Sequence, residues 1–153
     1  MIAAPPAKLW ELISDPHHLP RWWPRVERVE DVAGGAFTEL MRTAKGKAVR
    51  ADFDVVRADQ QTCTVTWAQR VQGTPFGRVL ASSETQVTLA GSGAPDPFSQ
   101  SGQALAGEQR TEVTIEMRQR LIGVFPRLGG RMVKRAAAAT IEEALDGLER
   151  MYG

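Results

Sequence analysis

Alternation of apolar and polar residues between positions 25 and 121 constrains the fold of this chain more than any other feature. In the clearest stretches every second residue is apolar: Val49, Ala51, Phe53 and Val55; Cys63, Val65 and Trp67; Val113, Ile115 and Met117. The residues between them are polar: Arg50, Asp52, Asp54, Thr62, Thr64, Glu112, Thr114 and Glu116. A period of two with one apolar and one polar face is typical of antiparallel strands. With turn residues at 34–35 and 45–47, the pattern predicts about six strands in a meander.

The apolar face of such a sheet needs a second layer to cover it. From residue 128 to the end, apolar residues recur at spacings of three and four: Val133, Ala137, Thr140, Ile141, Ala144, Leu148 and Met151. This spacing predicts a long amphipathic helix, the only expected element long enough to cover the sheet. The expected fold class is therefore α+β, an antiparallel sheet covered on its apolar face by a long C-terminal helix.

Prolines divide the N-terminal region into two short helices. The stretch at 5–14 reads as a helix that stops before Pro16, because a residue that precedes proline avoids helical geometry. Asp15 is placed to cap a second helix that starts at Pro16, and Pro20 and Pro24 keep it short. Residues 90–109, between the last two strands, are rich in Gly, Ser and Pro and predict a long flexible loop.

Size and composition indicate one globular domain over residues 1–153, with 42% apolar and 24% charged residues. The single cysteine, Cys63, has no partner for an internal disulfide, so we expect a reducing, cytoplasmic setting. No apolar run approaches the roughly 20 residues that cross a bilayer. A net charge of +1 gives no general attraction to nucleic acid.

Two adjacent pairs, His17-His18 and Trp22-Trp23, stand among these prolines. Neighbouring helical residues point about 100° apart, and the chain has no other histidine, so we expect no metal site. The tryptophans must also diverge. One could plug a cavity wall while the other sits at its rim, but a structural latch, with both pinning the short helices over the sheet, is at least as well supported.

The motifs "IAAPPAKLWELISDPHHLPRWWPRV", "SSETQVTL" and "ALDGLERMYG" together resemble the polyketide cyclase/dehydrase branch of the START-like and birch-pollen-allergen-like (SRPBCC) superfamily. The resemblance covers nearly the whole chain. It implies a helix-grip fold, in which a curved sheet and two short N-terminal helices enclose the C-terminal helix with a deep apolar cavity. Many relatives bind lipids, sterols, quinones or polyketides, and some are aromatase/cyclases.

That family begins with a further strand, which we expect to be truncated here, since only Met1-Ile2-Ala3 precede Ala4-Pro5-Pro6 of the opening motif. Either the natural start lies upstream, or the strand at 110–121 has a bare edge. A bare edge favours self-association, so a homodimer is one possible state.

The inward-facing residues are the expected ligand site, an apolar pocket with a few polar groups. The alternative is that they fill the core solidly. Four alanines at 136–139 favour a hollow slightly, because small side chains leave volume. The candidates are Trp23, Met41, Phe53, Trp67, Gln69, Ser83, Thr85, Ile115, Met117, Gln119, Ala137 and Ile141.

A basic run precedes an acidic run in the C-terminal region. Arg127, Arg131, Lys134 and Arg135 occur without an acidic residue among them, whereas Glu142 and the residues beyond it are acidic. A solvated face accounts for this run. The functional alternative is a rim that attracts an anionic ligand or an anionic membrane surface.

Three function classes follow. The preferred one is binding of a small hydrophobic ligand, such as a lipid, polyketide, quinone or other ring-containing molecule, with no cofactor. The second is an aromatic polyketide cyclase/dehydrase, in which Gln69, Arg42 or Arg70 would steer enolate chemistry, although both arginines point outward in this register. The third is a protein-interaction or stress-related module of the same fold. No phosphate loop, nucleophile elbow or acid-base pair assigns a catalytic residue.

Overall fold

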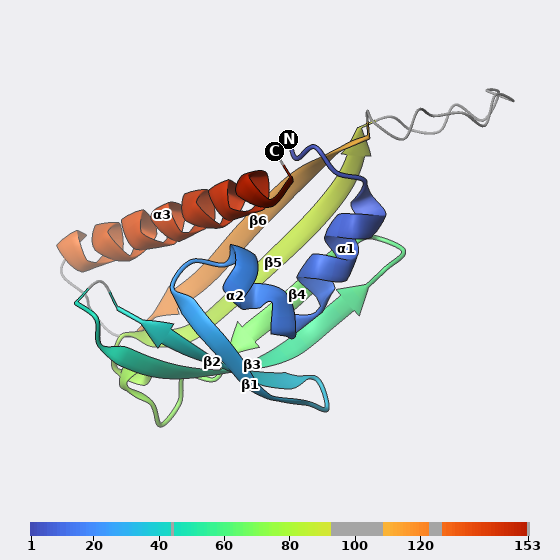
Figure 1. The fold of residues 1–153 in the computed structure, drawn as a ribbon. Helices are drawn as coiled ribbons and strands as arrows, with labels where there is room; N and C mark the ends of the chain where they lie inside the picture. Colours follow the sequence, from blue (N-terminus) through green and yellow to red (C-terminus); the bar gives the residue numbers. More distant parts are fainter. Residues whose placement is uncertain (44, 93–108, 123–126, 153) are drawn as a thin grey trace, which may run out of the picture.

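The computed structural model describes residues 1–43, 45–92, 109–122 and 127–152, and the side chains of residues 92 and 127–129 lie outside the description. A six-stranded antiparallel sheet curves beneath one long helix (Figure 1). Its strands follow chain order as a meander: β1 (Val26–Ala33), β2 (Ala36–Arg42), β3 (Ala48–Asp59), β4 (Thr64–Gln69), β5 (Leu80–Ser92) and β6 (Arg110–Leu121). The predicted helix-grip fold is confirmed. The predicted flexible loop falls largely on residues 93–108, outside the described residues.

The helices are α1 (Pro6–Ser14), the 3₁₀ turn η1 (Pro16–His18), α2 (Leu19–Trp22), the 3₁₀ turn η2 (Pro75–Arg78) and α3 (Arg127–Tyr152). The Asp15 carboxylate accepts a hydrogen bond from the His17 backbone N–H at 3.0 Å, which confirms the expected cap. No helix in the described part of the chain combines the length and the apolar character that crossing a bilayer requires.

The inward face of the sheet follows the predicted alternation. Phe37 of β2 pairs with Phe53 of β3 with stacked rings 5.2 Å apart, and Val65 of β4 pairs with Val87 of β5. In β6, Ile115 is buried and its neighbours Val113 and Met117 are half-buried. Cross-strand pairs of this kind stabilise a sheet.

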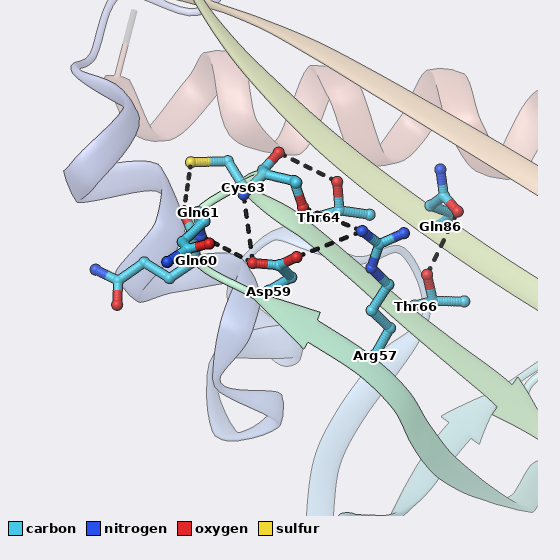
Figure 2. Close-up of polar contacts among 9 residues, drawn as sticks. Arg57, Asp59, Gln60, Gln61, Cys63, Thr64, Thr66 and Gln86 are labelled. Atoms are coloured by element: carbon cyan, nitrogen blue, oxygen red, sulfur yellow. Dashed lines mark hydrogen bonds and ion pairs between the residues drawn. The ribbon is translucent and has the colours of Figure 1, made fainter.

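Two details of the predicted pattern are wrong. Thr64 was expected on a wet face, yet it is only 5% exposed, and Thr66 is only 3% exposed. Both lie on β4, which is flanked by β3 and β5, and the Thr66 hydroxyl lies 3.5 Å from Gln86 Oε1 (Figure 2). Cys63 precedes the strand: its φ of 48° places it in the β3–β4 turn, where its thiol donates to the Gln60 carbonyl.

The outer face carries exposed ion pairs. Arg70 Nε donates to Asp54 Oδ2 at 2.8 Å, and Arg42 pairs with Glu27. The Arg70 guanidinium holds the pKa of Asp54 below its usual range. Exposed pairs of this type contribute little to stability. Both arginines therefore point away from the interior, as the register predicts.

The tryptophan pair joins the N-terminal helices to the sheet and to the long helix. Trp22 and Trp23 are 2% and 6% exposed, with ring centroids 5.3 Å apart and planes at 86°. Trp23 makes a second edge-to-face contact with Trp67 of β4 at 5.5 Å. Such pairs contribute beyond the area that they bury. This packing agrees with the latch interpretation, and contact of Trp23 with a ligand stays a prediction.

The helix α3 is anchored at its C-terminal half only. Ala144 and Leu148 are completely buried, whereas residues 131–139 are exposed except for the half-buried Val133 and Ala137. Gly147 lies so close to α2 that a β-carbon there would be 2.3 Å from the Trp22 carbonyl oxygen. The missing side chain at Gly147 therefore sets the distance between the two helices.

The outer edge of β6 pairs with the N-terminal segment at one point. The Ile2 N–H donates to the Thr111 carbonyl at 2.8 Å, and the Thr111 N–H returns a bond to the Ile2 carbonyl at 2.9 Å. Within the described ranges, no other segment pairs with this edge. Self-association through β6 stays a prediction.

Replacing Gly147 with alanine should destabilise the fold by about 2 kcal/mol, because the added carbon meets the Trp22 backbone and overpacking typically costs 1–3 kcal/mol. Urea denaturation measures the change in the free energy of unfolding. Gly130→Ala is the control: its β-carbon would meet only Leu121 Cδ1 at 3.9 Å, so it should be neutral or stabilising. Equal effects of the two substitutions would contradict this account of the anchor.

Candidate functional site

A cleft of about 810 Å³ opens beneath the N-terminal half of α3. Its walls come from the start of β3, from η2, from the ends of β5 and β6 that lie nearest to η2, and from α3. This size is in the range of small-molecule sites. The lining residues are Thr43, Lys47, Ala48, Val49, Arg50, Pro75, Phe76, Val79, Leu80, Met117, Gln119, Val133, Ala136, Ala137 and Thr140.

Small side chains on the helix and one close backbone contact keep the cleft open. Ala136 and Ala137 project only methyl groups toward the sheet, so the space opposite Met117 stays unfilled. On the other wall, a β-carbon at Gly77 would lie 2.4 Å from the Val71 carbonyl oxygen. The absence of a side chain there lets η2 pack against the chain that follows β4, which places Phe76 on the cleft wall.

The chemistry of the cleft wall is apolar with a few polar groups. Gln119 and Thr140 offer hydrogen-bonding side chains, and the exposed Lys47 brings positive charge. Arg50 borders the cleft, but its guanidinium pairs with Asp31 and Asp52 on the outer face. Among the described residues that line it, there is no aspartate, glutamate, histidine, cysteine or tyrosine. The wall therefore suits an apolar molecule that is neutral or anionic, and it carries no acid-base pair.

A second cleft of about 710 Å³ lies between β6 and α3, next to the first. It shares Met117, Gln119, Val133 and Ala137 with the first and adds Leu121, Gly130, Arg131, Lys134, Ala138 and Ile141. The two clefts flank α3 where the helix stands off β6. The basic residues Arg131, Lys134 and Arg135 are exposed along this part of the helix, and the side chain of Arg127 lies outside the description.

The predicted site residues fall into three groups. Met117, Gln119 and Ala137 line the main cleft, and Ile141 lines the second. Gln69 and Ser83 line a separate pocket that also contains Gln119, whose Nε2 donates to the Ser83 hydroxyl at 3.4 Å. The remaining candidates line neither cleft: Trp23, Phe53, Trp67, Thr85 and Ile115 are buried in the core, and Met41 is half-buried beside it.

The histidines lie at the surface beside Asp15. His17 Nδ1 is 2.8 Å from Asp15 Oδ1, and His18 Nε2 is 3.8 Å from Asp15 Oδ2. Within the part of the chain that the structure describes, no group of three or more metal-binding side chains converges.

Comparison with known families decides the classification. The family described as "Polyketide cyclase / dehydrase and lipid transport" matches residues 1–152. The chain belongs to this family. No curated protein matches the sequence.

Several solved structures resemble the fold of this chain. The di-domain aromatase/cyclase BexL of the BE-7585A biosynthetic pathway is 18% identical with a TM-score of 0.70; the match covers 97% of this chain and 43% of BexL. Ginseng major latex-like protein 151 from Panax ginseng is 17% identical with a TM-score of 0.65, covering 99% and 91% of the two chains. XoxI from Bacillus cereus is 12% identical with a TM-score of 0.67, covering 99% and 89%. At these identities the likeness shows the fold alone.

Sequence reasoning missed one buried carboxyl group, Glu39 of β2. Glu39 is 1% exposed and shares the inward face with Phe37 and Met41, two residues away on either side. Its Oε1 has no hydrogen-bond partner among the described residues. Burial raises the pKa of Glu39 to about 8. The signal was present, because the alternation that places Met41 inward also places Glu39 inward.

The raised pKa predicts that stability falls as the pH rises. A carboxyl that titrates near 4.5 when unfolded and near 8 when folded holds its proton more tightly in the folded state. Folding is then opposed by about 1.4 kcal/mol per pH unit between those values, or roughly 3 kcal/mol between pH 5.5 and pH 8.5. Urea denaturation at the two pH values measures this difference.

Glu39→Gln is the matched control, since it keeps the shape of the side chain and does not titrate. Between pH 5.5 and pH 8.5, the free energy of unfolding of Glu39→Gln should fall by roughly 3 kcal/mol less than that of the wild type. Surface groups such as Asp54, whose pKa is lowered by Arg70, affect both proteins equally and titrate below this window. Parallel pH profiles for the two proteins would show that Glu39 is not buried as described.

Proposed function

We propose that this chain binds a small hydrophobic molecule, a lipid, polyketide, quinone or other ring-containing compound, in the cleft beneath α3. The observation that carries the proposal is the 810 Å³ apolar cleft, which the alanines of α3 leave open. Membership of a family described by cyclase, dehydrase and lipid-transport activities supports it. Val49, Phe76, Leu80, Met117 and Ala137 would contact the apolar body, and Gln119 would orient it.

Filling the cleft from the helix should abolish binding. In Ala137→Trp, a large ring occupies space between α3 and Met117, so the dissociation constant for N-phenyl-1-naphthylamine should rise at least about tenfold. The fluorescence of the probe reports its binding directly. A stabilising shift in the melting temperature of the wild-type protein with the same probe, absent in Ala137→Trp, provides a second measurement.

Ala139→Trp is the matched control, because Ala139 is exposed on the same helix and lines neither cleft. This variant should bind the probe as the wild type does. Equal loss in both variants would point to general disruption of α3. Failure of the wild type to bind any member of a broad apolar panel would favour the protein-interaction function instead.

An aromatic polyketide cyclase is the second candidate, favoured by the fold likeness to BexL, which is titled an aromatase/cyclase. Such an enzyme needs a group that moves a proton next to the substrate. The described residues of the cleft wall include no carboxyl, imidazole, thiol or phenol group, and Lys47 is the one amine among them. Arg42 and Arg70 are engaged on the outer face. Gln69 and Gln119 could orient a carbonyl group but neither can exchange a proton. The residues of the cleft wall therefore favour ligand binding over cyclase catalysis.

The basic residues of α3 support a further element of the proposal, a rim that attracts anionic head groups or an anionic membrane surface. Arg131 and Lys134 line the second cleft, and the neighbouring Met132 is 72% exposed. Cationic side chains beside an exposed apolar side chain are typical of contacts with anionic bilayers.

Removing two of these charges should weaken binding to anionic vesicles. For Arg131→Gln/Lys134→Gln, partitioning onto vesicles of mixed phosphatidylglycerol and phosphatidylcholine should fall about thirtyfold, since each cation near such a surface contributes about 1 kcal/mol. Sedimentation with vesicles measures this. The control Lys8→Gln/Arg21→Gln removes the same charges from exposed positions on α1 and α2. Equal losses of vesicle binding in both double variants would show that only the net charge matters. No loss in either variant would show that these residues do not bind anionic membranes.

A further inference from the structure

Glu39 lies in the middle of the apolar layer that faces α3. Its cross-strand neighbours are Val29 on β1 and Ala51 on β3, and its neighbours along β2 are Phe37 and Met41. All four are apolar, and the side chain is 1% exposed. An unpartnered polar group in such a place costs stability, because it loses its water without gaining a partner. Nothing in the fold described above compensates for this cost.

The position of Glu39 relative to the main cleft follows from the strand register. Val49, which lines the cleft, pairs with Met41, and the next inward pair along the same two strands is Ala51 with Glu39. The carboxyl is therefore one residue pair behind the cleft wall. The side chains between them are small or adaptable: Ala51 carries a methyl group, and Met41 is a half-buried, flexible thioether.

We propose that Glu39 is the polar anchor of the ligand site, where its carboxyl group hydrogen-bonds a carbonyl or hydroxyl oxygen of an otherwise apolar ligand that enters past Met41 and Val49. The inference rests on the proposed function and specifies the chemical class of the ligand. A bound ligand of this class would also offer a hydrogen-bond partner to Glu39 Oε1, which has none among the described residues.

A neutral carboxyl group suits an oxygen function better than an amine. With burial raising its pKa to about 8, Glu39 carries a proton at neutral pH and offers one O–H donor and one carbonyl acceptor. An amine ligand would also have to pass the exposed Lys47 at the cleft, which repels a cation.

No charged side chain near Glu39 competes for this role among the described residues. From β1 and β3 the facing side chains are Val29 and Ala51. The charged residues of those strands form ion pairs with one another or with Arg42 and Arg70: Glu27, Arg28, Glu30, Asp31, Arg50, Asp52, Asp54, Arg57 and Asp59. The titratable groups of η1 and α2, which pack on β1, are surface residues: His17 and His18 beside Asp15, and the exposed Arg21.

Two probes of the same shape test the anchor: 2-acetylnaphthalene, which carries a ketone, and 2-isopropenylnaphthalene, in which a CH₂ group replaces the ketone oxygen. Neither probe titrates. Dissociation constants of both are measured at pH 6 and pH 9.5 for the wild type, Glu39→Gln and Glu39→Leu. The ratio of the two dissociation constants measures how strongly each protein prefers the ketone. Dividing this ratio by that of Glu39→Leu removes the difference in hydration between the two probes and leaves the contribution of the hydrogen bond.

At pH 6 the wild type should prefer the ketone about three- to tenfold more than Glu39→Leu does, the range expected for one net hydrogen bond. At pH 9.5 this preference should disappear, because an ionised carboxylate donates no hydrogen bond to a ketone. Glu39→Gln should keep the preference at both pH values, since its amide donates throughout. Glu39→Leu should fold at least as stably as the wild type, because it removes the unpartnered group.

Binding of both probes with the same ketone preference in all three proteins would overturn the anchor and leave the proposed function standing. A preference in the wild type that does not change with pH would also overturn it. Binding of neither probe to any of the proteins would remove the proposed function and this inference together. The Ala137→Trp variant separates these cases, because it blocks the cleft without altering Glu39.

Discussion

The contact between the Gly147 position of α3 and the Trp22 backbone is the constraint on which the rest of this structure depends. Only a glycine allows the helix to lie against α2 at that distance, and Ala144 and Leu148 are completely buried next to it. Packing therefore holds α3 at its C-terminal half. The N-terminal half has no comparable anchor, and the main cleft opens beneath it.

Side-chain size divides the interior into a closed part and an open part. On the closed side, the edge-to-face contacts from Trp22 through Trp23 to Trp67 fill the space between the short helices and the sheet. On the open side, the alanines at 136–137 face Met117 and Gln119 across unfilled volume. Close packing and a binding cavity coexist because bulky and small residues are segregated along the chain.

Glu39 is a buried carboxyl on a mostly apolar inward face. A buried carboxyl without a partner lowers the stability of the fold, and departures of this kind are expected where a protein gives up stability for function. Its location one residue pair behind Val49 connects it to the cleft, and the positive charge of Lys47 at the cleft disfavours cationic ligands. The apolar wall, the basic rim and the protonated carboxyl together favour an apolar molecule that bears oxygen.

Alternation and helical periodicity determined the order of elements, the antiparallel meander and the inward register of Phe53, Trp67 and Ile115. The prolines determined the limits of the short helices. All of these are local properties of the chain, so the sequence alone was enough to predict them. The opening motif was sufficient to indicate the family. Only the tertiary structure decided that those three side chains fill the core while Met117, Gln119 and Ala137 line the cleft, since this depends on where α3 leaves the sheet. It also decided the surroundings of Glu39: burial raises the pKa of this carboxyl, and none of the described residues offers its Oε1 a hydrogen bond.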